Sequence, residues 1–470
     1  MTQPKNIAYC RQLFVDDALI DRIEEDVRLH LHKPVPREVV AVYDAQWEGC
    51  TSMSVTIFKD AETYRMYYRA SGRRQNDWKN PRVGYAQSTD GIHWRKPNLG
   101  LVAFAGSKTN NLILDSHPNL GTSAFTPFKD TNPDCPSHSR YKAIAERGSA
   151  ALYGYVSSDA IHWQPVNKGD PILVPDGRID VGQRHFFDSQ NLVFWDALRK
   201  KYVMFFREWD GRLRMIRTVT SDDFEKWQYD RSERLSYANT DVYSDSFQLY
   251  TSAVVPYERA PQIYIGFPTR LMKDESTEPY LMASRDGRQF YFWGKEPVIP
   301  RTAPKDRQGN RGNYMQWGIV RTGDKEVSVY ATEGYEDAGQ SRLRRFTYRV
   351  DGFGSVRAGT QGGELVTRPI TFDGGQLVLN FVTREGGSLR VEVQDERGTP
   401  LDGFGLVACR PLQGDEIACV VAWKSGSDVR RLAGQAIRLR FEMKDTDLYS
   451  FRFRNVSKGS LNQPDAGDGE

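Results

Sequence analysis

Short apolar and aromatic runs alternate with polar turns along the first 350 or so residues of the chain. Segment 54–70, SVTIFKDAETYRMYYRA, consists of an apolar run, a turn containing an aspartate, and an aromatic run. The same order returns in segments 125–147, 191–208, 250–270 and 317–333. Runs of this length separated by turn residues are typical of β-hairpins. The pattern therefore predicts five repeats, each with a first strand, a hairpin turn and a second strand.

Each repeat ends in a related turn motif of the approximate form SxDGxxW. Its aspartates recur every 63 to 69 residues, a spacing that leaves room for four strands per repeat. The carboxylate is expected to cap backbone N–H groups of its own turn and the tryptophan to pack between sheets, so these residues are predicted to be structural. The copies are STDGIHW at 88–94, SSDAIHW at 157–163, TSDDFEKW at 220–227, SRDGRQFYFW at 284–293 and the degenerate YRVDGF at 348–353. Their aspartates are Asp90, Asp159, Asp222, Asp286 and Asp351.

A different rhythm begins near residue 360. LVLNFV, LRVEVQD, ACVVAW and IRLRFEM alternate apolar and polar residues between glycine-rich turns, which indicates the strands of a β-sandwich. The predicted fold is all-β, with a five-bladed β-propeller over residues 1–356, a β-sandwich over 357–458 and a flexible tail over 459–470. Segment 11–33, which carries the strand-like run LFV, is expected to supply the edge strand that closes the propeller ring.

Charge and composition narrow the range of partners. Lys and Arg number 64 against 61 Asp and Glu, and no tract concentrates the positive charge, so a nucleic-acid partner is not expected. The sequence has no run of about 18 apolar residues and no signal-like start, which predicts a soluble, cytoplasmic protein, or a secreted one had a leader been removed. Five cysteines without a CxxC pair indicate neither disulfides nor a zinc site, and no metal or cofactor is expected. The oligomeric state is left open.

Candidate site residues follow from the predicted geometry. In a small propeller, the starts of the first strands and the ends of the second strands converge on one mouth around the axis. A ring of acids and arginines at such a mouth suits a carbohydrate, whose hydroxyl groups need both donors and acceptors. Residues at first-strand starts are Glu48, Asp188, Asp245 and Gln316. Residues at second-strand ends are Arg69, Glu146, Arg207, Glu208, Arg270 and Glu333.

Glycoside hydrolysis needs two carboxyl groups, one protonated and one ionised. The sequence nominates Glu48 in WEGCTS, Asp188 in HFFDSQN and Glu333 in YATEGYE, although each has the alternative of a salt-bridged structural acid. Glu146 and Glu208 adjoin arginines and are interpreted as plain ion pairs. The predicted substrate-binding residues are Trp47, Arg69, Gln190, Asn191, Arg207, Arg270, Asp245 and Gln316.

Several segments of the chain together resemble a bacterial group of glycoside-hydrolase-family-32-like propellers. They are LFVDDALI, WEGCTS, YRMYYRA, FDSQNLVFWDALRKKYV and LRRFTYRVDGF. The resemblance, to a superfamily that includes families 32, 43, 68 and 130, implies that Asp188 is the middle, transition-state-stabilising aspartate. It implies that Glu48 or Asp17 is the nucleophile or base. Of the candidate acids, Glu333 matches the family's catalytic positions least well. The chain has no WMNDPNG-like box, RDP triplet or EC acid motif, so fructofuranosidase activity is not implied.

Three functions remain open at the level of the sequence. The first is a glycosidase, exo-acting on a terminal furanosyl or related sugar. The second is a sialidase-like hydrolase, prompted by the Asp-box-like turns and by Arg69, Arg207 and Arg270, which would suit an anionic sugar. The third is a carbohydrate-binding propeller without catalysis, prompted by the absence of the family's catalytic sequence motifs.

Overall fold

The computed structural model describes residues 3–71, 81–117, 119–175, 186–209, 213–229, 235–238, 247–301, 313–336 and 341–455. The predicted all-β class is confirmed, since no α-helix occurs in these ranges and strands carry the fold. Short 3₁₀ helices lie at η2 (Ser137–Ser139), η3 (Asn167–Gly169) and η6 (Arg430–Leu432). No helix within the described ranges is long and apolar enough to cross a membrane.

The chain divides into two compact units. The terminal unit comprises Met1–His32, Glu258–Gln262 and Arg349–Glu470, and the repeat unit comprises Lys33–Tyr257 and Ile263–Tyr348. The sequence placed residues 1–356 in one domain, whereas the first 32 residues belong to the terminal unit. The difference arises because the N-terminal strands pair with strands from the end of the chain.

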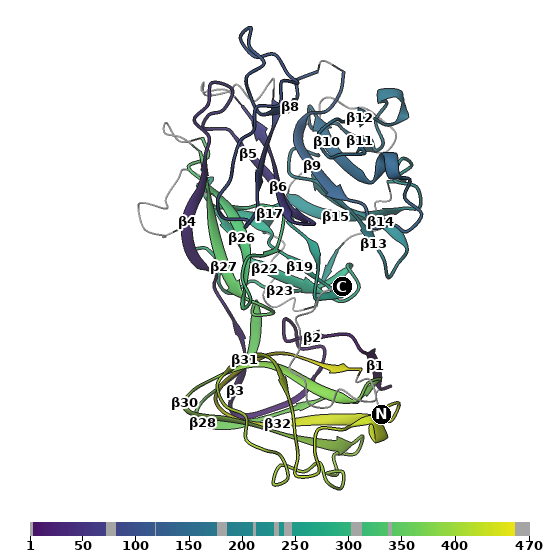
Figure 1. Cartoon of the computed structure of the whole chain (residues 1–470), viewed down its shortest axis with the longest axis vertical. Coiled ribbons are helices and arrows are strands. Elements are labelled where there is room, and N and C mark those ends of the chain that lie inside the picture. The colour runs from purple at the N-terminus through teal and green to yellow at the C-terminus, as the bar shows by residue number, and fades with distance from the viewer. Residues whose placement is uncertain are drawn as a thin grey trace. The chain divides into compact units, whose positions relative to one another are not determined.

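The repeat unit consists of small, mostly antiparallel sheets (Figure 1). The first has the order β5 (Met53–Asp60), β6 (Thr63–Ala70), β7 (Arg82–Ser88), β8 (Leu112–Leu114). The second has the order β9 (Ser123–Lys129), β10 (Tyr141–Arg147), β11 (Ala151–Ser157), β12 (Gln164–Pro165), and the third β13 (Leu192–Asp196), β14 (Lys201–Trp209), β15 (Arg214–Ser221).

Two sheets follow from the fourth repeat and one from the fifth. The fourth repeat gives β17 (Gln248–Thr251), β20 (Thr269–Leu271), β21 (Thr277–Pro279), and beside them β18 (Val255–Tyr257), β19 (Ala260–Gly266), β22 (Leu281–Ser284), β23 (Gln289–Trp293), β16 (Ser236–Tyr237). The last sheet has the order β24 (Tyr314–Met315), β26 (Glu326–Glu333), β27 (Arg342–Arg349), β4 (Val35–Val42), with β25 (Val320–Arg321) beside β26.

Apolar residues run continuously along β5 and β6 because both faces of these strands are covered. In β5 and β6 nearly every position is buried, without the alternation of a half-exposed strand. Val55 and Ile57 pack with Met66 and Tyr68 in a cluster that Leu343 of β27 also joins. β-Branched and aromatic side chains fill such layers well, which explains the 12% of aromatic residues in the chain.

The aspartates of the repeated turns cap their own backbone, as predicted. Asp159 Oδ1 accepts the N–H groups of Ile161 at 2.9 Å and His162 at 2.8 Å, and Ser157 Oγ donates to the same oxygen at 3.0 Å. The next residue, Ala160, takes a φ of 66°, the left-handed conformation for which Gly91 and Gly287 are suited at the matching positions. Asp90 and Asp286 make the same contacts.

In the third turn the capping residue is Asp223, which corrects the prediction of Asp222. Asp223 Oδ1 accepts the N–H groups of Glu225 and Lys226, whereas Asp222 pairs with Lys201 and its side chain is 80% exposed. The correct register is visible in the spacing, because Trp227 stands four residues after Asp223, as Trp94 stands after Asp90.

The degenerate fifth motif is a different structure. Asp351 is fully buried in the terminal unit and does not cap its own turn. It pairs instead with Arg11 at 3.4 Å and Arg259 at 3.0 Å, and Ser450 Oγ donates to it at 2.7 Å. The five predicted copies are therefore four capped turns and one buried ion-pair centre.

Replacing Asp159 by alanine is expected to lower the free energy of unfolding by about 1 kcal/mol, because the N–H groups of Ile161 and His162 lose their acceptor. The measurement is urea unfolding followed by circular dichroism. Asp222→Ala is the matched control and should change the free energy by less than about 0.5 kcal/mol. Equal effects of the two substitutions would contradict the assigned capping role.

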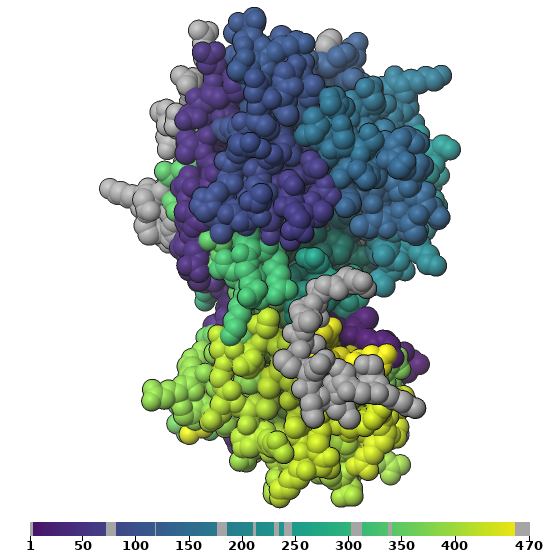
Figure 2. All heavy atoms as spheres, viewed as in Figure 1, coloured from purple at the N-terminus to yellow at the C-terminus, as the bar shows by residue number. Residues whose placement is uncertain are grey.

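The strand that joins the two ends of the repeat unit is β4, not a strand from segment 11–33. β4 pairs antiparallel with β27, with Val42 opposite Arg342 and Val35 opposite Thr347. In Figure 1 the purple of β4 lies against the green of β27, and these colours also adjoin in Figure 2. A parallel bridge between Thr56 and Trp317 connects the first and last repeats as well. All of segment 11–33 except Lys33 belongs to the terminal unit, where β2 and β3 pair with other strands.

The terminal unit is built on one eight-stranded sheet. Its strands are β1 (Lys5–Ala8), β2 (Gln12–Leu13), β3 (Ile20–Leu31), β28 (Gly354–Thr367), β29 (Ile370–Phe372), β30 (Gln376–Asp395), β31 (Asp415–Val420) and β32 (Ile437–Arg454). The register between the long strands β30 and β32 shifts between Thr383 and Ser388. The tail predicted over 459–470 lies outside the described residues.

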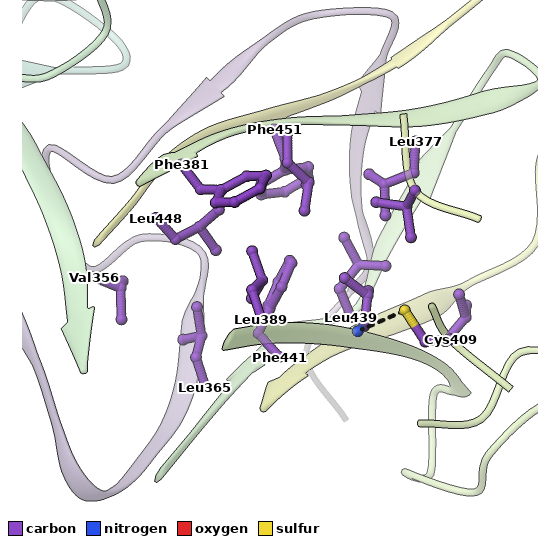
Figure 3. Packing of buried hydrophobic residues seen from close by; sticks show 14 of the residues in the cluster. Val356, Leu365, Leu377, Phe381, Leu389, Cys409, Leu439, Phe441, Leu448 and Phe451 are labelled. Atoms are coloured by element: carbon purple, nitrogen blue, oxygen red, sulfur yellow. Dashed lines mark hydrogen bonds between the residues drawn. The ribbon is translucent and has the colours of Figure 1, made fainter. Parts of the chain in front are cut away.

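The core of the terminal unit lies between the two halves of these long strands. Figure 3 shows Phe381 and Phe451, from one side of the register shift, pointing toward Leu389 and Phe441 from the other. Cys409 lies at the edge of this core, where its Sγ accepts the backbone N–H of Val391 at 3.3 Å. All five cysteines are free thiols.

Candidate functional site

A group of polar and aromatic side chains from successive repeats surrounds Asp188. Asp188 stands four residues before β13, and the Asn191 side chain holds its turn by donating to the carbonyls of Phe187 at 2.8 Å and Ser189 at 3.0 Å. Asn191 is itself almost fully buried, so its side chain anchors the turn to the protein interior. We call the group the Asp188 cluster; its described members are Arg69, Glu146, Asp188, Arg207, Arg214, Tyr250, Tyr314 and Tyr335.

Asp188 presents a carboxylate to the solvent while its partners are buried. Its side chain is 41% exposed, whereas that of Arg207, whose Nη2 lies 3.0 Å from Asp188 Oδ2, is 0% exposed. The hydroxyl of Tyr250 donates to the same oxygen at 3.4 Å. A buried guanidinium group therefore contacts one oxygen of Asp188, while the carboxylate remains partly accessible to solvent.

Glu146, at the end of β10, is the second carboxyl group of the cluster. It is 7% exposed, and its Oε2 accepts the backbone N–H of Ser149 at 2.9 Å. Burial raises the pKa of Glu146, and the negative charge of Asp188 raises it further, although Ser123, the Ser149 N–H and Arg69 act in the opposite direction. The two carboxyl groups thus have opposite environments, one buried and one half-exposed beside a cation.

Arg69 interacts with both carboxyl groups. Its Nη2 donates to Thr51 O at 2.9 Å and to the Tyr335 hydroxyl at 3.2 Å. Burial alone would lower the pKa of Arg69, but Tyr335, Asp188 and Glu146 raise it. The guanidinium group is therefore a positive charge, held by Thr51 and Tyr335, that both acids influence.

Aromatic rings complete the cluster. The guanidinium carbons of Arg207 and Arg214 lie 4.5 and 5.4 Å from the centre of the Tyr250 ring. Tyr314 packs edge-on against Tyr250 at 5.7 Å and against Tyr335 at 5.6 Å. These rings give the site apolar faces next to its charges, the combination that sugars need.

Glu48 lies elsewhere in the repeat unit and is fully buried. Its Oε1 accepts the hydroxyl of Tyr68 at 2.5 Å, and its Oε2 accepts Lys96 Nζ at 2.7 Å. Burial raises the pKa of Tyr68 well above its ordinary value, and the charge of Glu48 adds to this. A hollow of about 520 Å³ borders Tyr68 and Lys96, and none of its described lining residues belongs to the Asp188 cluster. The contacts of Glu48 are those of a structural buried acid.

Glu333 and Glu208 are also engaged with arginines. Both oxygens of Glu333 accept hydrogen bonds, from Arg342 Nε and Arg344 Nε at 2.8 Å each, and its side chain is 0% exposed. Glu208 forms a buried pair with Arg217 and accepts the hydroxyl of Tyr229 at 2.5 Å. Among the described residues, Glu333 contacts Arg342 and Arg344 and does not contact Asp188.

The predicted binding residues divide between the cluster and other places. Arg69 and Arg207 belong to the cluster, whereas Arg270 lies over the Phe247 ring at 3.6 Å. Trp47 donates to the Asn111 side chain, outside the cluster. Asp17 is exposed in the terminal unit, and Asp245 lies outside the described residues.

Gln190 and Gln316 hold backbone. Gln190 Nε2 donates to Val55 O at 2.7 Å, and Gln316 Oε1 accepts the Val55 N–H at 2.5 Å. Both side chains are buried and tie the strands of the third and fifth repeats to β5.

Sequence reasoning did not select Arg214, Tyr250 or Tyr335, and it interpreted Glu146 as an ion pair with its neighbour. Tyr250 and Tyr335 stand at strand ends, in QLYTS and TEGYE, where the same rule that selected Asp188 could have found them. Arg214 begins β15, a third strand, and carries no such signal. Within the described residues, no group of three or more His, Cys, Asp or Glu side chains could hold a metal ion.

Fold and cluster together define an all-β protein with a half-exposed carboxylate, a buried carboxyl group and three arginines at one site. No protein-family model matches the chain, and no curated protein does. A glycoside hydrolase is among the similar solved structures, with 13% identity, a TM-score of 0.48 and coverage of 67% of this chain and 92% of that one.

Two further similar structures are described by their reactions or ligands. One belongs to the GH130 family of mannoside phosphorylases, which contains glycoside hydrolases that target beta-1,2 mannosidic linkages in Candida mannan (13% identity, TM-score 0.47, coverage 68% and 94%). The other is an N-acetylgalactosamine deacetylase from F. plautii in complex with blood group B trisaccharide (12% identity, TM-score 0.48, coverage 69% and 96%).

Proposed function

We propose that this protein is a glycoside hydrolase that uses Asp188 and Glu146 as its two carboxyl groups. The observation that carries the proposal is the difference between their environments within one cluster. Burial and the Asp188 charge raise the pKa of Glu146, while Arg207 and Tyr250 support the charge of the half-exposed Asp188. One carboxyl group kept protonated beside one kept ionised is the arrangement that glycoside hydrolysis requires.

In this mechanism Glu146 donates a proton to the glycosidic oxygen as the bond to the anomeric carbon breaks. Asp188 acts on the anomeric carbon, either directly or through a water molecule, and its charge supports the oxocarbenium-like transition state. Asn191 and Arg207 hold Asp188 in place. The resemblance of the sequence favours removal of a terminal furanosyl or related sugar.

We also propose that the repeat unit is a five-bladed β-propeller and the terminal unit a β-sandwich. The five repeats, the β4–β27 pairing and the bridge from Thr56 to Trp317 support a closed ring. For the terminal unit, support comes from the facing halves of β30 and β32 around one core.

The function is tested by the dependence of kcat/KM on pH. Because burial raises the pKa of Glu146, activity should fall as pH rises through a value above the ordinary range of a glutamate, as the acid loses its proton. Glu146→Gln should abolish this alkaline limb and lower turnover of an unactivated glycoside about 10²-fold. An aryl glycoside with a good leaving group should be affected much less, because that group departs without a proton.

Glu62→Gln, an exposed acid in the β5–β6 turn, is the control and should leave the profile unchanged. An alkaline limb that persists in Glu146→Gln would contradict the role of Glu146. Binding of glycans without any product from the wild-type protein would instead show a binding module.

A further inference from the structure

The Asp188 cluster carries more positive than negative charge. Three guanidinium groups, of Arg69, Arg207 and Arg214, face the carboxyl groups of Asp188 and Glu146. The raised pKa of Glu146 reduces the negative charge further. Among the described members of the cluster, guanidinium groups therefore outnumber carboxyl groups, and an anionic ligand would be attracted to them.

Arg214 is the member of this group that the acids neutralise least. Within the described residues no carboxylate forms an ion pair with Arg214, and its Nη1 donates to the neutral Gln248 Oε1 at 2.7 Å. Burial lowers the pKa of Arg214, and the charge of Arg207 lowers it further. Two guanidinium groups near one tyrosine ring repel each other, and a bound anion would relieve this repulsion.

The guanidinium group of Arg214 is also held in position before any ligand arrives. It lies 5.3 Å from the Trp209 ring centre and 5.4 Å from the Tyr250 ring centre. Contacts with two aromatic rings and one amide fix the direction of its N–H groups. A guanidinium group fixed in this way loses little conformational entropy when it binds a planar anion.

We propose that the sugar bound at the Asp188 cluster bears a carboxylate, as a uronic acid does, and that Arg214 binds this carboxylate. The planar fork of N–H donors of an arginine matches the two oxygens of a carboxylate, and a neutral sugar would leave the excess charge uncompensated. The inference rests on the proposed function, because Asp188 then lies at the anomeric carbon while Arg214 recognises the acid group of the same sugar.

The test measures affinity in the Glu146→Gln background, which suppresses turnover. Isothermal titration calorimetry would compare oligosaccharides ending in glucuronic or galacturonic acid with the same oligosaccharides ending in glucose or galactose. The acidic ligands should bind about 10-fold to 100-fold more tightly, as expected for one charge-assisted contact. This preference should weaken as ionic strength rises.

Arg214→Gln should remove the preference, because it weakens binding of the acidic oligosaccharides most, and Arg214→Lys should restore part of it. Arg270→Gln is the matched control, since Arg270 also lies over an aromatic ring but outside the cluster, and it should keep the preference. Equal affinity for acidic and neutral ligands, or a preference that survives Arg214→Gln, would overturn the proposal. So would equal or tighter binding of a sulfated sugar, which would indicate a general anion site.

The outcomes separate this inference from the proposed function. Release of sugars from neutral glycans alone would support the hydrolase and overturn the acidic substrate. A preference for acidic oligosaccharides that depends on Arg214, with no product from any of them, would support the inference about the ligand and count against hydrolysis.

Discussion

Replacing Asp188 by asparagine is expected to lower kcat for glycoside hydrolysis about 10³-fold, with little change in the affinity for the glycan. Asparagine has nearly the same shape and can still accept the hydrogen bond from the Tyr250 hydroxyl, but it carries no charge to pair with Arg207 or to support the developing positive charge of the sugar. The measurement is the initial rate of release of reducing sugar, first on a glycan panel and then on the best substrate.

Asp222→Asn serves as the control, because this exposed aspartate pairs with Lys201 at the surface. Its rate should equal that of the wild type. Thermal unfolding of Asp188→Asn should show a folded protein, since the Asp188 side chain is 41% exposed. Turnover that is undiminished in a folded Asp188→Asn variant would remove Asp188 from the mechanism.

Asp351→Asn is expected to destabilise the terminal unit by about 3–5 kcal/mol. Asp351 is fully buried, and its loss of charge would leave Arg11, itself 3% exposed, and Arg259 without their shared counter-charge. Amide hydrogen exchange followed by mass spectrometry measures this in peptides from the core strands β30 and β32, which should lose protection.

The same ion pairs predict a dependence of stability on pH. Burial alone would raise the pKa of Asp351, but Arg11 and Arg259 outweigh it and lower the pKa to about 2. Because the pKa is lower in the folded protein than in the unfolded chain, the stabilisation is present above about pH 4 and is lost as pH falls toward 2. Asp402 is an exposed acid in the same unit. Asp402→Asn should change neither the hydrogen exchange of β30 and β32 nor the dependence of stability on pH. Unaltered exchange in Asp351→Asn would contradict the role of the buried pair.

The all-β class and the position of Asp188 could be predicted from the sequence because both follow from strand periodicity. Glu48 could not be placed correctly by the same rule. Tyr68 and Arg69 are neighbours on β6 and point to opposite faces, so Glu48 joins Tyr68 on one face while the Asp188 cluster meets Arg69 on the other. Which face a preceding loop approaches depends on that loop's own backbone, which the periodicity of the strand does not encode.

Turn register and pairing partners show the same limit. Asp222 and Asp223 are adjacent residues of the same type. The spacing of four residues to Trp227 identifies Asp223 as the capping residue only if the turn is known to have a fixed length. The choice of β4 as the partner of β27 depends on a contact between segments some 300 residues apart. Local composition does not specify a pairing between such distant segments, because neighbouring segments of the chain have a similar strand propensity.

The pairing of β4 with β27 also sets an order for folding during synthesis. β4 leaves the ribosome early, but its hydrogen-bonding partner follows only after some 300 further residues have been translated. β3 likewise awaits β28 in the terminal unit. Contacts of such high contact order form slowly, and an unpaired strand edge is prone to association with other chains in the meantime. Each unit can therefore complete its sheets only after these distant strands have been translated, which makes the nascent chain a natural client for chaperones that shield exposed strand edges.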